Sequence, residues 1–193
     1  MSNSFHLAIP AGDLKKAEAF YTDILGCKTG NREDGKWVDI DFWGNELTLH
    51  QTKMKLHRER HDVDMGNVPV PHFGVHLKKA EAFYTDILGC KTGNREEGKW
   101  VDIDFWGNEL TLHQTSMKLP RERHDVDMGQ VPVPHFGVHL KKDVFKKIKA
   151  NIEANKIDYI DKPYTRFEGT EFEQNTFFIE DPNGNVLELK TFD

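Results

Sequence analysis

A long internal repeat constrains the fold of this chain more than any other feature of its sequence. Residues 14–79 and 77–142 match at an offset of 63 positions. They differ at only four pairs: Asp34/Glu97, Lys53/Ser116, His57/Pro120 and Asn67/Gln130. Such identity indicates a recent or an engineered duplication rather than an old one. Removing one 63-residue copy from the 193 residues leaves 130, which is the size of one small domain.

The composition is that of a mildly acidic globular protein. The chain has 26 basic and 32 acidic residues. Its net charge of −6 argues against nucleic acid or an anionic membrane as a partner. No run of about 18 apolar residues and no signal-peptide pattern occurs, so we expect a cytoplasmic protein. Cys27 and Cys90 occupy the same place in the two copies of ILGCKTG, and we expect both to be reduced thiols.

The first half of the 130-residue parent predicts a strand, a helix and a meander of strands. FHLAIP at residues 5–10 is a short apolar strand, and Asp13 is placed to cap a helix over residues 14–25. Gly26 should end that helix. KWVDIDFW then alternates with period two, and Gly44-Asn45 forms a turn into the strand ELTLHQ.

The second half of the parent repeats this order. HFGVHL at residues 135–140 predicts a strand, and Asp143 is placed to cap a helix over residues 144–156. NTFFIEDPNGNVLELKTF at residues 175–192 predicts a hairpin that turns at Asp181-Pro182-Asn183-Gly184. Between the halves, the prolines and charges of RERHDVDMGQVPVP indicate a linker.

The duplication therefore predicts three modules in one chain. The first module spans residues 1–55 and the last spans residues 135–193, joined through linkers at 56–71 and 118–134 to a middle module at 72–117. The middle module is a chimera, because its first strand comes from the last module and its helix and hairpin come from the first. The predicted fold class is α+β, with repeated βαβββ modules.

At these segments the chain resembles the vicinal oxygen chelate superfamily, which includes glyoxalases, bleomycin resistance proteins and extradiol dioxygenases. The resemblance is strongest to its small extradiol-dioxygenase-like proteins and covers nearly the whole parent. It rests on FHLAIPAGDLKKAEAFYTDILGC, DFWGNELTLHQ, VPHFGVHL, PYTRFEGTEFEQ and FFIEDPNGNVLELK. It implies two βαβββ modules whose curved, mixed sheet surrounds a divalent metal.

The resemblance also implies the metal ligands. By position they are His6 on the first strand of the first module, His135 on the first strand of the last module, and Glu188 on its final strand. His72 is the copy of His135 in the middle module and is an alternative ligand. Two imidazoles and one carboxylate leave positions open for substrate and oxygen. The metal is iron(II) if the protein is a dioxygenase, with zinc, nickel and manganese as alternatives.

The alternation of VLELK supports Glu188 independently. This side chain should lie on the face opposite Leu187 and Leu189, and a carboxylate on an inner face needs a metal or a cationic partner. The alternative is an outward-facing surface glutamate.

Two repeated histidines are candidates for acid–base catalysis. His50 and His113 lie two residues beyond the position that aligns with Glu188, so each shares its face of the sheet. A histidine exposed at a strand end is the alternative. The repeated RERHD cluster resembles a metal-binding motif, but its charges are more typical of a solvated linker.

Three residues of PYTRFEGTEFEQ should flank the substrate pocket, by the same resemblance. They are Tyr164, a candidate catalytic group, and Arg166 and Gln174, candidates for substrate binding. Arg166 has the planar fork that binds a carboxylate through two hydrogen bonds. The alternative is a rim arginine paired with Glu168 or Glu173.

The resemblance implies a metal-dependent enzyme that cleaves the ring of a catechol-like small molecule. Three alternatives remain: a glyoxalase-like isomerase or lyase, a metal-free small-molecule-binding resistance protein, and a duplication variant without activity. An odd number of modules leaves one without a partner in its own chain, so we expect a homodimer. Contiguity favours pairing of the middle module with the last, but we expect the first and last modules to pair, within or between chains, since their interface is that of the parent.

Overall fold

The computed structural model describes residues 4–54, 58–63, 66–71, 74–75, 77–114, 121–126 and 129–192. His72, one of the predicted metal ligands, lies outside these residues. The chain divides into two compact units. Unit 1 comprises Met1–Lys55, Arg121–Ile179 and Val186–Asp193, and unit 2 comprises Leu56–Pro120 and Glu180–Asn185.

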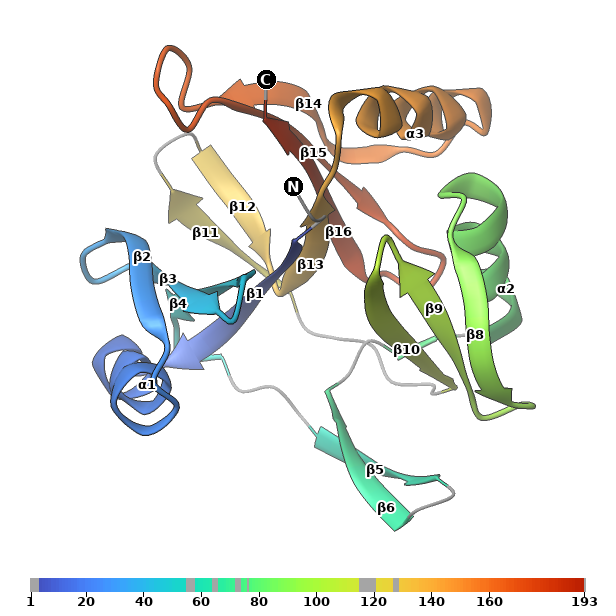
Figure 1. Cartoon of the computed structure of the whole chain (residues 1–193), viewed down its shortest axis with the longest axis horizontal. Helices are drawn as coiled ribbons and strands as arrows, with labels where there is room; N and C mark the ends of the chain where they lie inside the picture. The colour runs from blue at the N-terminus through green and yellow to red at the C-terminus, as the bar shows by residue number, and fades with distance from the viewer. Residues whose placement is uncertain are drawn as a thin grey trace. The chain divides into compact units, whose positions relative to one another are not determined.

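Unit 1 is built on one mixed sheet of eight strands, in the order β14-β15-β16-β13-β1-β4-β3-β2 (Figure 1). The strands of its first module are β1 (Phe5–Gly12), β2 (Lys28–Glu33), β3 (Trp37–Phe42) and β4 (Asn45–Gln51). Those of its last module are β13 (His135–His139), β14 (Tyr159–Arg166), β15 (Gln174–Glu180) and β16 (Val186–Phe192).

The two modules of unit 1 join through their first strands. β1 runs parallel to β4 and β13 runs parallel to β16, whereas β1 and β13 are antiparallel. In this register His6 lies opposite Gly137 and Ala8 lies opposite His135. The predicted fold class is therefore confirmed, and the first module pairs with the last within the chain.

The first predicted helix begins where expected and changes its winding halfway. The Asp13 carboxylate accepts a hydrogen bond of 3.2 Å from the Lys16 amide, so the predicted cap is confirmed for α1 (Leu14–Ala19). The following turn, η1 (Phe20–Ile24), is a π-helix in which the Leu25 amide reaches back to the Phe20 carbonyl. Gly26, at φ +73°, ends the helix as predicted.

The predicted cap of the last helix is wrong. α3 (Lys142–Ala154) begins two residues earlier than expected, with Lys141 at the cap position and no side-chain hydrogen bond there. Asp143 lies instead in the first turn, where its carboxylate still faces the positive end of the helix dipole. The predicted apolar face is correct, since Phe145, Ile148 and Ile152 are buried.

Both predicted linkers contain a two-stranded antiparallel hairpin. The first is β5 (Arg58–Val63) with β6 (Gly66–Pro71), and the second is β11 (Glu122–Val126) with β12 (Gly129–Val133). In the second hairpin Val131 and Val133 are buried against Phe178 and Val186. This linker is therefore part of the unit 1 core, because its alternating valines supply apolar surface that the prolines and charges obscured.

The described residues of the chimeric middle module fold in unit 2 as a βαβββ unit. It comprises β7 (Gly74–Val75), α2 (Leu77–Ala82), η2 (Phe83–Ile87), β8 (Lys91–Glu96), β9 (Trp100–Phe105) and β10 (Asn108–Gln114), in the sheet order β7-β10-β9-β8. β7 pairs in parallel with β10, as β1 does with β4. The Gln114 side chain accepts from the Leu77 amide at 2.9 Å, as Gln51 does for Leu14. No helix among the described residues is long and apolar enough to cross a membrane.

Gly137 allows the central strands to approach each other closely. It pairs with His6 on one side and with Glu188 on the other. A Cβ atom at this position would overlap the carbonyl oxygen of Glu188, a backbone atom that cannot move without displacing β16.

We therefore expect Gly137→Ala to lower the free energy of unfolding by about 3 kcal/mol, because β13 and β16 must separate. Urea unfolding measures this loss. Gly30→Ala is the control, since the Cβ added there would meet the Asp39 Cβ at 3.3 Å and its backbone oxygen at 3.8 Å, which needs only a small shift. Equal stabilities of the two variants would contradict the prediction.

Candidate metal centre

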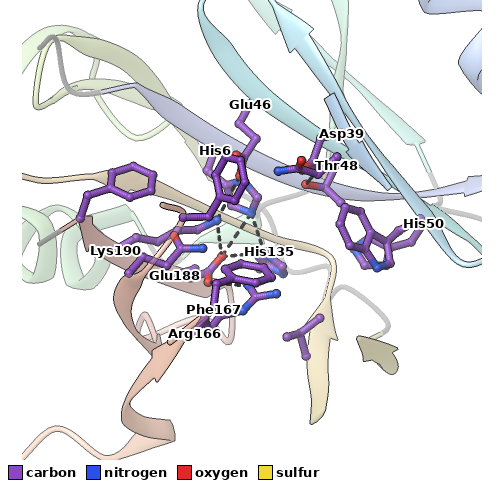
Figure 2. Close-up of a pocket in the computed structure, with 16 residues that line it drawn as sticks. His6, Asp39, Glu46, Thr48, His50, His135, Arg166, Phe167, Glu188 and Lys190 are labelled. Atoms are coloured by element: carbon purple, nitrogen blue, oxygen red, sulfur yellow. Dashed lines mark hydrogen bonds and ion pairs between the residues drawn. The ribbon is translucent and has the colours of Figure 1, made fainter. Parts of the chain in front are cut away.

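Three predicted ligands from three strands meet in one cavity of unit 1. His6 comes from β1, His135 from β13 and Glu188 from β16, and all three are buried (Figure 2). They line a cavity of about 290 Å³. Their candidate ligand atoms lie within 4.8 Å of one another, and no other such cluster of three occurs in the part of the chain that the structure describes.

The spacing of the three ligand atoms suits a metal ion. The two Nε2 atoms of His6 and His135 are 2.9 Å apart, and each lies 3.2 Å from Oε2 of Glu188. Two donors at about 2.1 Å from a metal are about 3.0 Å apart at a right angle and about 3.4 Å apart at a tetrahedral angle. The donor set and its spacing therefore fit a divalent ion bound on one face.

Each imidazole has a partner at its other ring nitrogen. His135 Nδ1 lies 2.6 Å from the Pro132 carbonyl oxygen, which can only accept, so this nitrogen carries the proton. His6 Nδ1 lies 2.6 Å from Oε1 of Glu46 on β4. Both Nε2 atoms face the cavity and lie in hydrogen-bond contact with each other, so one of them carries a proton that a metal ion would displace.

Two cations and a hydroxyl surround the Glu188 carboxylate. The Lys190 ammonium lies 3.2 Å from Oε2 of Glu188, and Arg166 Nη1 lies 3.7 Å from its Oε1. The Thr176 hydroxyl donates to the same Oε1 at 2.9 Å. Because one buried carboxylate is costly, these partners explain how Glu188 remains charged inside the sheet.

The pKa shifts at the site follow from burial and from these partners. Burial alone would raise the pKa of Glu188, but Lys190 and hydrogen bonds from the two imidazoles hold it well below its usual range. Burial lowers the pKa of His135 and so favours its neutral, ligating form. Burial also disfavours the Lys190 ammonium, yet Glu188 and Glu46 outweigh it and raise the pKa of this lysine.

His50 lies in the same cavity and is held neutral. It is buried on β4, its Nδ1 has no hydrogen-bond partner, and burial, aided by the nearby imidazoles, lowers its pKa to about 3. Its ring contacts that of His124, at 5.0 Å between centroids, and His124 Nε2 lies 3.1 Å from a Glu122 carboxylate oxygen. One end of the RERHD cluster therefore packs beside the site instead of facing only solvent.

The other predicted residues divide into those on the cavity wall and those away from it. Arg166 and Gln174 are buried on the wall, and neither Arg166 Nε nor Gln174 Oε1 has a hydrogen-bond partner. Arg166 stacks on the Phe167 ring at 5.0 Å rather than pairing at the rim. Tyr164 packs on the valine cluster instead, and burial raises its pKa to about 12. His113 lies on β10 of unit 2.

Sequence reasoning missed two charged residues at the centre of the site, Glu46 and Lys190. Strand alternation in the sequence does indicate their faces: Glu46 lies on the same face as His50, and Lys190 on the same face as Glu188. Their pairing was not visible, because they are 144 positions apart, and Lys190 Nζ lies 3.1 Å from Glu46 Oε1. The wall also includes Asn31, Trp37, Asp39, Thr48, Val131, Phe167, Phe172 and Phe192.

Comparisons with known proteins give structural similarity alone. No family model matches the sequence, and no curated protein matches it. The similar solved structures include members of the glyoxalase/bleomycin resistance/dioxygenase superfamily. One, from Alicyclobacillus acidocaldarius, is 24% identical, covers 98% of this chain and 90% of its own, and has a TM-score of 0.29. The fosfomycin resistance protein FosX from Listeria monocytogenes is 13% identical over 64% of this chain and 93% of its own, with a TM-score of 0.48.

The buried neutral His50 predicts an acid-sensitive stability. Its pKa of about 3 in the folded state is below the unfolded value of about 6.5, so the unfolded chain binds more protons as the pH falls below 6.5. Between about pH 7 and about pH 5 this linkage costs the folded state about 2 kcal/mol. We expect His50→Asn to remove that part of the pH dependence in urea unfolding without metal.

His113→Asn is the reference variant, since it removes the same histidine from the repeat. Parallel stability curves for wild type and His50→Asn across this pH range would show that His50 does not titrate as described.

Proposed function

We propose that this chain binds one divalent metal ion in unit 1 and acts there on a small molecule. The observation that supports this most is the convergence of His6, His135 and Glu188, with ligand atoms 2.9 to 3.2 Å apart. Two histidines and a carboxylate on one face suit iron(II) in oxygenases, while zinc, nickel and manganese accept the same donors. Such an ion supplies a Lewis acid and open positions for oxygen ligands.

The surrounding residues define what kind of substrate fits. Arg166 offers buried N–H donors, and Gln174 offers an unpartnered carbonyl oxygen, so a ligand with both acceptor and donor groups satisfies them. Phe172 and Phe192 line the same cavity and are 48% and 45% exposed, which offers apolar contact to a flat ring. These features support a catechol-like substrate.

His50 is the proposed catalytic side chain. A neutral, buried imidazole with a free Nδ1 can accept or donate a proton at a substrate hydroxyl in this cavity. Ring cleavage consumes oxygen, whereas a glyoxalase-like isomerisation in the same site does not. Oxygen consumption therefore separates the two reactions.

We expect wild type to bind one metal ion per chain and Glu188→Gln to bind less than about a tenth of that, because the amide provides no anionic ligand. Metal content by mass spectrometry measures this after reconstitution with iron(II) under argon. The loaded protein is then offered a panel of catechols in an oxygen electrode, where wild type should consume oxygen.

His72→Ala is the control, because it removes the copy of His135 that this proposal does not use. It should retain one ion per chain. Equal occupancy in wild type and Glu188→Gln would refute the metal site, and turnover without oxygen uptake would exclude ring cleavage in favour of isomerisation.

We also propose a homodimer formed through the middle module. Within the described chain, β7 pairs only with β10, whereas β1 has a second neighbour in β13. An open strand edge favours pairing with a second copy. Light scattering should give twice the chain mass of 22.3 kDa, and a monomer that persists at high concentration would contradict this assembly.

A further inference from the structure

We propose that Glu46 is a positioning residue that fixes the His6 ring and its tautomer for metal binding. This inference rests on the proposed metal site and adds a residue that does not touch the metal. Its consequence is that the affinity for the ion depends on a strand of the first module, β4, that supplies no ligand.

The contact is a short ion-pair approach of a carboxylate to an imidazole nitrogen, without the alignment of a hydrogen bond. Oε1 of Glu46 lies 2.6 Å from Nδ1 of His6, and the opposite nitrogen, Nε2, is the one that faces His135 and Glu188. A neutral imidazole that binds a metal through Nε2 must carry its proton on Nδ1. A carboxylate at Nδ1 favours that tautomer and makes the ligand more basic.

The surrounding contacts hold Glu46 in place. It pairs directly with His6 in the parallel register of β1 and β4, so the backbone sets their separation. Lys190 Nζ lies 3.1 Å from the same Oε1, and His139 Nε2 lies 3.8 Å from it. With its side chain only 34% exposed, Glu46 is thus restrained by the Lys190 ammonium and by two imidazoles.

The repeat contains a natural control for this role. Glu109 occupies the same position in the identical strand NELTLHQ of unit 2, and it is exposed. The described residues of β7 reach only His113 and Gln114 of β10, so they place no histidine opposite Glu109. Of the two equivalent glutamates, therefore, only Glu46 lies beside a proposed metal ligand among the described residues.

The experiment compares Glu46→Ala and Glu46→Gln with Glu109→Ala and Glu109→Gln. Cobalt(II) alone is titrated into each metal-free protein, and binding is followed by visible absorption. We expect the dissociation constant to rise about 10- to 100-fold in Glu46→Ala and by less in Glu46→Gln, whose carbonyl can still accept from Nδ1. Both Glu109 variants should bind as wild type does.

A second readout is independent of metal. Long-range proton–nitrogen NMR of the metal-free protein in alkaline buffer reports which nitrogen of His6 carries the proton. We expect the proton on Nδ1 in wild type, and on Nε2 in Glu46→Ala, where it can donate to His135 Nε2 at 2.9 Å. If the alanine variant does not fold, the glutamine variant supplies both measurements.

The outcomes separate this inference from the proposed function. If wild type binds no cobalt, the metal site fails, and the His6 tautomer alone decides the role of Glu46. If wild type binds cobalt and both Glu46 variants bind it equally well, Glu46 does not position His6. Loss of affinity with an unchanged tautomer would likewise overturn the inference.

Discussion

The antiparallel pairing of β1 with β13 is the interaction on which the rest of unit 1 depends. It joins two modules into one sheet and brings together two histidines that are 129 positions apart in the chain. Neither module alone contains the three ligands, because His6 lies in the first, and His135 and Glu188 lie in the last. The site is thus a property of the interface, and any change that separates these two strands removes the site before it removes either module.

Burying several charges at this interface requires that they compensate one another. Glu188, Lys190 and Glu46 form a chain of contacts of 3.1 to 3.2 Å, and the His6 ring closes it. Each isolated charge would cost several kcal/mol in the sheet interior. Together they keep the Glu188 carboxylate charged, which is the state that a cation needs. Burial and Lys190 lower the pKa of His6, but Glu46 and Glu188 outweigh them and raise it, so a metal ion would have to displace a proton from this ring. The same contacts restrict how the side chains can rearrange, so the site is preorganised.

Much of the fold could be predicted from local sequence patterns. Alternation of apolar and polar residues predicted the strands, and helical spacing of apolar residues predicted the helices. The cap at Asp13 followed from local chemistry, whereas the cap expected at Asp143 failed, because α3 starts earlier at Lys142. His6, His135 and Glu188 were identified through resemblance to a family rather than through spacing. Glu46 and Lys190 escaped notice because their roles arise from a contact across 144 positions, which the periodicity of a single strand does not encode. The valines of β12 were missed because neighbouring prolines suggested a loop.

The near-identity of the two copies also has a consequence for how the chain reaches this structure. β3 and β4 share their sequences with β9 and β10, so during folding β1 and β7 each meet two strands that can accept them equally well. Such degeneracy is a form of frustration, and only the segments outside the copied region distinguish the correct partner. Residues 13–44 separate β1 from β4, whereas residues 13–107 separate it from β10, so the loop that β1 must close is much shorter with β4. Chain connectivity, through loop-closure entropy, therefore selects which copy completes the sheet that contains the site.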